Sequence, residues 1–214
     1  MAQINKPNTQ FNTVLYAGNG GTQSVTGVNF QPDWTWIKER NSGAYNHNLF
    51  DVVRGVLKTI QSNNTGAEQN ATTALSSFNA DGFTVGTDIG VNENGTNFAS
   101  WNWLGGGTAV SNTDGTITSS VSANTDSGFS VVTWTGTASN ATVGHGLGVV
   151  PKITIVKNRN IIANWIVGGS LIEDVGGSTN NYILLNTDAG MDTSTALYAS
   201  YNTDTIGVKT DANI

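Results

Sequence analysis

The sequence predicts an all-β protein, built either as two tandem antiparallel β-sandwich repeats of the jelly-roll kind or as one large two-sheet domain that merges both repeats. Apolar and polar residues alternate over many short stretches, and helical periodicity is almost absent. Ser, Thr, Asn and Gly account for 99 of the 214 residues. Such a composition favours turns and pleated strands and disfavours helices.

An internal duplication organises the chain. Residues 11–41 align with residues 129–160 when one residue is inserted near His145. A second block, 78–85, aligns more weakly with 201–208 in the same order. The chain is therefore interpreted as two copies of one unit. In the first block nine aligned positions are identical: Phe11/Phe129, Val14/Val132, Gly18/Gly136, Val25/Val143, Gly27/Gly146, Pro32/Pro151, Lys38/Lys157, Arg40/Arg159 and Asn41/Asn160.

The duplication sets the expected domain boundaries. Residues 1–10 form an N-terminal arm, 11–104 the first β-sandwich repeat, 105–128 a Gly/Ser/Thr-rich linker and 129–214 the second repeat. Within the linker, residues 116–123 alternate well enough to be a strand of the second unit. The alternative is a purely flexible linker.

The second repeat is expected to lack its last strand. Residues 97–103 form a strand-like segment in the first repeat, and no counterpart follows residue 208. The neighbouring strand would then present an open edge, which recruits another strand. The expected donor is the arm, residues 1–10, from the same chain or from another copy. We therefore expect a homo-oligomer.

Individual strands follow from alternation between turn signals. Trp34 and Trp36 share one face of a predicted strand, and Trp101 and Trp103 share one face of another. Tryptophans at such alternating positions are more often buried than exposed, so all four are expected in the core. Only residues 67–77 are compatible with a short helix. The turn signals are Gly20-Gly21, Asn63-Asn64, Asp81-Gly82, Asn94-Gly95, Asp114-Gly115 and Gly176-Gly177.

The residues that usually carry catalysis or bind metals are sparse. Two separated histidines, His47 and His145, without any cysteine make a zinc site improbable. No nucleophile elbow and no carboxylate pair of the glycosidase kind occurs, so we predict that the protein is not an enzyme and needs no cofactor. Metal binding is undecided, because Asp188 and Asp192 could supply oxygens to calcium although no calcium-loop motif is present. The repeated Asp81 is expected to accept hydrogen bonds from backbone amides in a turn.

Three residues of the second repeat are candidate ligand contacts. Trp165 lies in an irregular stretch and is expected to expose its ring, which suits sugar stacking. Lys157 and Arg159 belong to a Lys-x-Arg-Asn pattern that ends a strand in both repeats. Because this pattern is duplicated, ion pairing or capping of carbonyls is the alternative role. His145, within Gly-His-Gly-Leu-Gly at 144–148, is expected to lie in a tight turn that needs positive φ.

Charge and hydropathy exclude several partners. The formal net charge is −6 and the sequence pI is about 4.6, which argues against a nucleic-acid partner. No apolar run approaches the ~18 residues of a membrane-spanning helix, so membrane insertion is not expected. The chain has no cysteine and therefore no disulfide framework.

Six motifs follow one another along the chain. They are Phe-Asn-Thr-Val-Leu-Tyr-Ala-Gly-Asn-Gly at 11–20, Phe-Gln-Pro-Asp-Trp-Thr-Trp-Ile-Lys at 30–38, Phe-Asp-Val-Val-Arg-Gly at 50–55, Phe-Asn-Ala-Asp-Gly-Phe at 78–83, Ser-Asn-Thr-Asp-Gly at 111–115 and Gly-His-Gly-Leu-Gly at 144–148. In this order they resemble a repeat of tail-fibre-like proteins from marine bacteriophages, and the similarity covers nearly the whole chain. The resemblance implies a virion appendage protein with a loosely concanavalin-A-like sandwich. It gives no binding residues.

Two function classes remain on the sequence alone. The first is a virion structural protein on the external surface of a bacteriophage. It would be a tail fibre or other appendage that attaches to the host surface, with a capsid decoration protein as the alternative. The second is a lectin-like carbohydrate-binding module, which could also be the task of the appendage. The expected partners are other copies of the chain, with a trimer favoured by the resemblance, other virion proteins and a host surface glycan.

Overall fold

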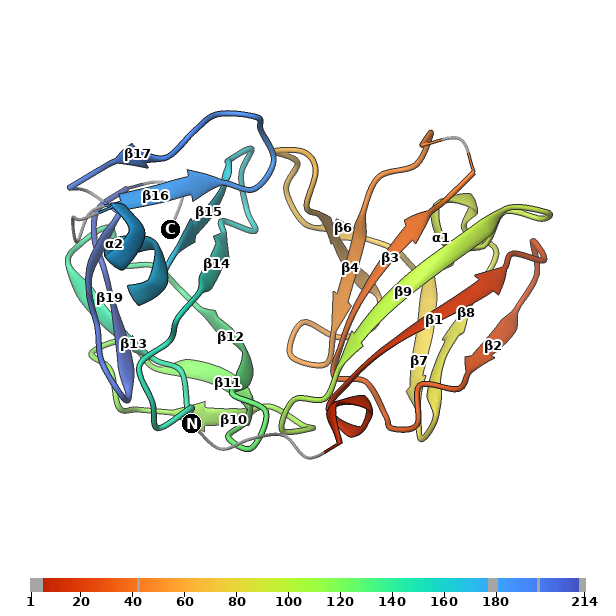
Figure 1. The fold of residues 1–214 in the computed structure, drawn as a ribbon, viewed down its shortest axis with the longest axis horizontal. Coiled ribbons are helices and arrows are strands. Elements are labelled where there is room, and N and C mark those ends of the chain that lie inside the picture. The colour runs from red at the N-terminus through yellow and green to blue at the C-terminus, as the bar shows by residue number, and fades with distance from the viewer. Residues whose placement is uncertain (1–5, 42, 177–180, 196, 212–214) are drawn as a thin grey trace. The chain divides into compact units, whose positions relative to one another are not determined.

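A computed structural model describes residues 6–41, 43–176, 181–195 and 197–211 (Figure 1). The chain is all-β and consists of several antiparallel sheets. Its contacts divide it into two compact units. Unit 1 comprises Met1–Ser62 and Glu68–Thr108, and unit 2 comprises Asn63–Ala67 and Ala109–Ile214. Unit 2 thus includes a short segment that lies between two strands of unit 1 in the sequence.

Unit 1 contains two sheets. One has six strands in the order β1-β9-β3-β4-β5-β6, and the other has three in the order β2-β8-β7. All described pairings in both are antiparallel. The elements are η1 (Pro7–Thr9), β1 (Phe11–Ala17), β2 (Gln23–Thr26), β3 (Trp34–Glu39), β4 (Asn48–Asp51), β5 (Lys58–Gln61), β6 (Gln69–Asn70), β7 (Leu75–Asn79), β8 (Gly82–Val85), α1 (Ile89–Asn92) and β9 (Asn97–Trp103).

One apolar core joins the two sheets of unit 1. Ile37 on β3, Phe50 on β4 and Phe98 on β9 are fully buried, and they belong to the same cluster as Phe83 and Val85 on β8. Burying side chains of this size contributes about 1.5–3 kcal/mol each. The core therefore lies between the inner faces of the two sheets.

Unit 2 contains three sheets. Their orders are β10-β11-β12, β13-β19-β18 and β14-β15-β16-β17. Two smaller apolar clusters fill the unit, and the half-buried Trp134 and Tyr201 pack against both of them. The elements are β10 (Val110–Asn112), β11 (Ser119–Asn124), β12 (Phe129–Trp134), β13 (Ala141–Gly144), β14 (Thr154–Lys157), β15 (Trp165–Gly168), α2 (Ser170–Gly176), β16 (Asn181–Leu184), β17 (Asp192–Thr193), β18 (Tyr198–Tyr201) and β19 (Thr205–Val208).

The two units share strand order, as the duplication predicts. The order β2-β8-β7 of unit 1 recurs as β13-β19-β18, and β3-β4-β5-β6 recurs as β14-β15-β16-β17. The register is also conserved. Val25 lies opposite Phe83 in unit 1, and the aligned Val143 lies opposite Ile206 in unit 2.

The strand that pairs with the first strand of each repeat differs in origin. In unit 1 it is β9, which follows the rest of the repeat, and it pairs with both β1 and β3. In unit 2 it is β11, which precedes the repeat and pairs with β12 as a hairpin. Of the two strands that β9 joins in unit 1, the counterpart of β1 therefore has no open edge in unit 2, because residues 119–124 of the linker region pair with it. The counterpart of β3 is β14, and among the described strands this side of it has no partner. Residues 1–5 of the expected donor arm lie outside the described residues.

Two local expectations have different outcomes. Residues 67–77, the segment compatible with a short helix, do not form one, because they contribute to β6 and β7. The glycine-rich turn around His145 is confirmed, because Gly146 and Gly148 have φ of 69° and 68°. The buried His145 holds this turn, since its Nδ1 accepts the amide hydrogen of Leu147 at 3.2 Å and its Nε2 lies 3.1 Å from the carbonyl oxygen of Asn202.

Candidate ligand-binding face

Four tryptophans of unit 1 lie on the outer face of its six-stranded sheet. Because side chains alternate across a strand, the buried Ile37 and Phe98 place the adjacent even positions of β3 and the odd positions of β9 on the opposite face. Trp34, Trp36, Trp101 and Trp103 occupy these positions, and all four are half-buried. The expectation that they belong to the core is therefore wrong.

The register across the sheet brings these rings together. Trp34 lies opposite Trp103 and Trp36 opposite Trp101, while Phe11 on β1 lies opposite Trp103. The ring centroids are 4.5 Å apart for Trp34 and Trp103, 6.1 Å for Trp36 and Trp101, and 4.6 Å for Phe11 and Trp103. Tilted and edge-to-face contacts of this kind hold aromatic rings in fixed orientations. We call these five residues the aromatic face.

Polar side chains orient one edge of the aromatic face. The indole nitrogen of Trp36 donates to Nδ1 of His47 at 2.9 Å. Burial, with a smaller contribution from the positive charge of Lys38, lowers the pKa of His47 and so favours the neutral ring that can accept this bond. The ammonium of Lys38 is held by the carbonyl oxygen of Tyr45 at 2.9 Å and lies 3.5 Å from the carboxylate of Glu39.

A buried carboxyl fixes the opposite edge. Asp33 precedes Trp34 and is only 1% exposed. Its Oδ2 accepts the amide hydrogens of Gly105 and Gly107 at 2.9 and 3.0 Å, so it ties the start of β3 to the segment after β9. Burial raises the pKa of Asp33, and the two amide hydrogen bonds oppose this effect.

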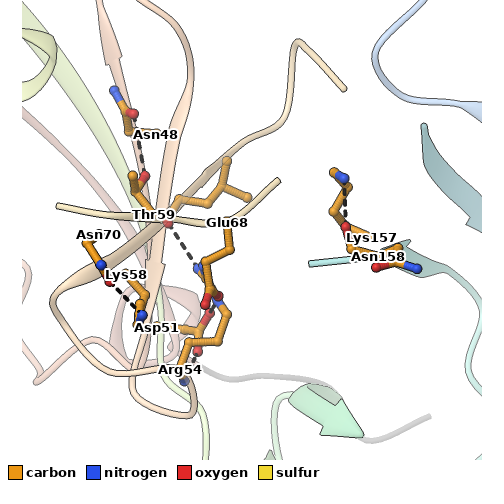
Figure 2. A network of polar contacts seen from close by, with 10 residues as sticks. Asn48, Asp51, Arg54, Lys58, Thr59, Glu68, Asn70, Lys157 and Asn158 are labelled. Atoms are coloured by element: carbon orange, nitrogen blue, oxygen red, sulfur yellow. Dashed lines mark hydrogen bonds and ion pairs between the residues drawn. The ribbon is translucent and has the colours of Figure 1, made fainter. Parts of the chain in front are cut away.

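A buried ion cluster supports β4 beside the aromatic face (Figure 2). Arg54 pairs with Asp51 and, at 3.4 Å, with Glu68, and its guanidinium also donates to the carbonyl oxygen of Leu49 at 3.0 Å. The side chains of Arg54 and Asp51 are each 3% exposed. Removing one partner from so buried a cluster would leave an uncompensated charge. The cluster thus fixes the turn that follows β4.

Unit 1 also has a polar pocket of about 260 Å³ near the start of β4. The buried Asn48 organises its floor. The side-chain nitrogen of Asn48 donates to the carbonyl oxygens of Asn46 and Gly90, and its oxygen accepts from Gln61. The same oxygen accepts from the hydroxyl of Thr59 at 3.5 Å (Figure 2). The lining is mostly uncharged and includes the carboxamides of Asn46, Asn48, Gln61, Gln69 and Asn70, with Asp88 as the acidic group.

The three predicted ligand contacts of unit 2 differ in their surroundings. Trp165 is 4% exposed, so the expectation of an exposed ring is wrong. The ammonium of Lys157 donates to the carbonyl oxygens of Asn158 and Ile161 at 2.7 and 3.2 Å, and burial lowers its pKa. This is the capping alternative considered for the repeated lysine. Arg159 is half-buried in the loop after β14.

The acidic residues considered as metal ligands or turn formers have structural partners. Asp192 accepts hydrogen bonds from the hydroxyl of Tyr182 and from the amide of Thr193, whereas Asp188 is exposed. Asp81 accepts from the amides of Asn29 and Gly27 at 2.6 and 3.0 Å. These donors are backbone amides, as expected, but they belong to a distant segment and not to the turn of Asp81 itself. Among the described ranges, no cluster of three or more metal-ligating side chains is found.

The described part of the chain contains no helix long and apolar enough to cross a membrane. A family model, described as a domain of unknown function (DUF7483), matches residues 6–213. The chain belongs to this DUF7483 family. No curated protein and no solved structure is significantly similar to it. The DUF7483 match spans both units, so the duplicated arrangement lies within one family domain.

The sequence pattern predicts neither the aromatic face nor the pocket, and the reasons differ. The alternation that groups the tryptophans was visible, but it does not say which face of a strand is buried. The composition of β9 even favours the wrong face, because Phe98 shares the buried face with the polar residues Ser100 and Asn102. The carboxamides of the pocket come from separate segments, so no local pattern could bring them together.

Proposed function

We propose that this protein is a non-enzymatic virion structural protein, a tail fibre or other surface appendage, that attaches to the host by binding a surface glycan on its aromatic face. The observation that carries the proposal is the outward position of Trp34, Trp36, Trp101 and Trp103. Each of the four indole rings is half-buried and so keeps part of its apolar area exposed, and together they form one apolar patch. Such patches mark interaction sites.

A glycan is the ligand class that best matches this surface. Sugar rings present C–H groups on one face, which pack on indole rings, and hydroxyls at their edges, which pair with donors and acceptors. Trp combines an apolar body with one polar N–H, and this combination is common in binding surfaces. The polar groups beside the rings are the imidazole of His47 and the ammonium of Lys38. The pocket around Asn48 is a separate feature, because Asn48 lies opposite the buried Ile37 and therefore on the other face of the sheet.

The wider role rests on fold and resemblance together. In this proposal each unit is a jelly-roll-like β-sandwich repeat, and the motifs shared with tail-fibre-like proteins support a place on the external surface of a virion. The protein would assemble there with other virion proteins and with copies of itself, a trimer being favoured by the same resemblance.

A glycan array with the full chain, in the presence and absence of calcium, tests the binding proposal. We expect Trp101→Ala to weaken binding to any glycan that scores positive by at least about tenfold, which is 1.4 kcal/mol. The matched control is Ile155→Ala, because Ile155 occupies the position of Trp36 in unit 2. If no glycan binds, or if both variants bind equally well, the aromatic face is not a glycan site.

Two further measurements address the virion role. Density for the chain on an intact particle would separate a tail appendage from a capsid decoration protein, and its absence from the particle would refute both. A product assay on host surface polysaccharide tests the non-enzymatic part of the proposal. Release of sugar fragments would contradict it.

A further inference from the structure

The first strand of the four-stranded sheet in unit 2 has a neighbour on one side only. β14 pairs with β15, and no other strand of the described residues pairs with it. Its counterpart in unit 1, β3, is paired on both sides, with β4 and with β9. The correspondence is position by position, because Trp36 lies opposite Leu49 on β4 and the aligned Ile155 lies opposite Val167 on β15.

β11 replaces β9 at only one of its two pairings. In unit 1, β9 lies between β1 and β3 and pairs with both. In unit 2, β11 pairs with β12, but its other edge is taken by β10 and not by β14. The place that β9 holds beside β3 therefore has no occupant beside β14 among the described strands. A strand edge left in this state presents a row of amide and carbonyl groups for pairing.

Apolar side chains lie at the same edge. Ile153 and Ile155 are 54% and 47% exposed, and they stand at the positions of Trp34 and Trp36. In unit 1 the residues at these positions contact Trp103 and Trp101 of β9. Lysine often blocks pairing at a sheet edge, but the ammonium of Lys157 is bound to two carbonyl oxygens of the following loop.

We propose that the edge of β14 binds an extended segment of a different polypeptide as an added antiparallel strand. The pairing of β9 with β3 indicates which side chains the added strand carries. Trp103, Trp101 and Ala99 lie opposite Trp34, Trp36 and Lys38. The added strand accordingly carries bulky apolar side chains opposite Ile153 and Ile155 and a small one opposite Lys157. Main-chain hydrogen bonds supply affinity in such strand addition, and the alternate side chains supply specificity.

A second copy of this chain is a poorer occupant than a different polypeptide. Two β14 strands that overlap along their full length in antiparallel fashion would place Ile155 of each copy opposite Val156 of the other. Ile155 is exposed and Val156 is buried, so this register would put residues from opposite faces of the two sheets on one face. Each copy would also bring only isoleucines to the positions where β9 brings tryptophans.

The β9 sequence itself is a suitable probe. A fluorescent peptide of residues 96–104 (Thr-Asn-Phe-Ala-Ser-Trp-Asn-Trp-Leu) is titrated into the full chain, and amide hydrogen exchange is mapped by mass spectrometry with and without it. We expect saturable binding and slower exchange across residues 153–157. A peptide with serine at both tryptophan positions should bind at least about tenfold more weakly.

Variants of the full chain locate the site. Ile155→Asp should weaken peptide binding at least about tenfold, because it puts a charge where the bulky side chain docks. The matched control is Ile162→Asp, at a residue that is 80% exposed and outside β14, and it should bind as the wild type does. Equal melting temperatures of the three proteins establish that they are folded. If Ile155→Asp does not fold, the site is tested by the wild type alone, through slower amide exchange across residues 153–157 on peptide binding.

Three results would overturn the proposal. The first is the absence of saturable peptide binding, and the second is binding that leaves exchange at residues 153–157 unchanged. The third is slow amide exchange at these residues in the absence of peptide, which becomes fast when the protein is diluted. This result would mean that a second copy of the chain occupies the edge. The proposal does not depend on glycan binding, because Trp101→Ala should leave peptide binding unchanged.

Discussion

The indole nitrogen of Trp36 donates a hydrogen bond to Nδ1 of His47 over 2.9 Å, and this bond ties the aromatic face to the loop before β4. The bond exists only while Nδ1 is unprotonated. His47 therefore positions the indole ring of Trp36, and the charge state of His47 controls that position.

Binding at the aromatic face should weaken in acid. The pKa of His47 is lowered by burial first and by Lys38 second. The neutral His47 ring contributes to the free energy of unfolding above the unfolded-state pKa of about 6.5, and this contribution is lost as pH falls through the lower folded-state pKa. Between these two pKa values we expect the free energy of unfolding to decline with falling pH. The tryptophan fluorescence of the wild type should change over the same pH range, because Trp36 loses its hydrogen bond to His47. His47→Gln should remove the dependence. An unchanged profile in that variant would exclude His47 as the titrating group.

Two aromatic residues on β9 should differ sharply in their effect on stability. Phe98 is fully buried in the core of unit 1, so Phe98→Ala should lower the free energy of unfolding by about 3–5 kcal/mol. Trp101 lies on the outer face and is only half-buried, so Trp101→Ala should cost clearly less. Denaturant titration measures both. Equal losses would mean that the aromatic face is a second core.

Asp33 should give the opposite pH dependence to His47. Burial raises its pKa, so its contribution to stability is complete below the unfolded value and is lost as pH rises through the folded value. Asp33→Asn should flatten this slope in a plot of melting temperature against pH. Asp33→Ala should flatten it too and should also cost about 1–3 kcal/mol, because the amides of Gly105 and Gly107 lose their acceptor. A slope that persists in both variants would assign it to another carboxyl.

Gly82 should not tolerate a side chain. Its φ is 131°, and a Cβ at this position would lie 2.0 Å from the carbonyl oxygen of Val25 on β2. Gly82→Ala should therefore disturb the pairing of β2 with β8 and destabilise unit 1 by roughly 1–3 kcal/mol or more. The control is Thr205→Ala at the aligned position of unit 2, which already carries a Cβ. Equal melting temperatures for both variants would contradict this account.

Residue patterns predicted the larger features of the fold. Identities such as Val25/Val143 anticipated that β2 and β13 hold the same place in both units, and alternation located β3, β9 and β14. These features follow from local periodicity and from duplication, which a single sequence contains. The all-β class follows from the same signals together with the abundance of turn residues.

Other features depended on contacts that local patterns do not encode. Alternation cannot tell which face of β3 is buried, so it predicts a core position for Trp36 although the core residue is Ile37. The irregular sequence around Trp165 predicts an exposed ring, yet Trp165 starts the buried strand β15. The pairing of β11 with β12 required knowing that a strand from the linker region could serve in place of β9.

The positions of β9 and β11 in the sequence also determine the order in which the two units can fold during synthesis. In unit 1 the side chain of Asn102 reaches the carbonyl oxygen of Asn12 across 90 positions of sequence, so its largest sheet closes only after β9 has been synthesised. In unit 2 the corresponding pair is a hairpin between adjacent strands, β11 and β12. Contacts distant in sequence form more slowly than local ones. A ribosome-bound chain that has not yet reached Trp103 therefore exposes β1 and β3 without their shared partner, whereas the hairpin of unit 2 can form as soon as it emerges.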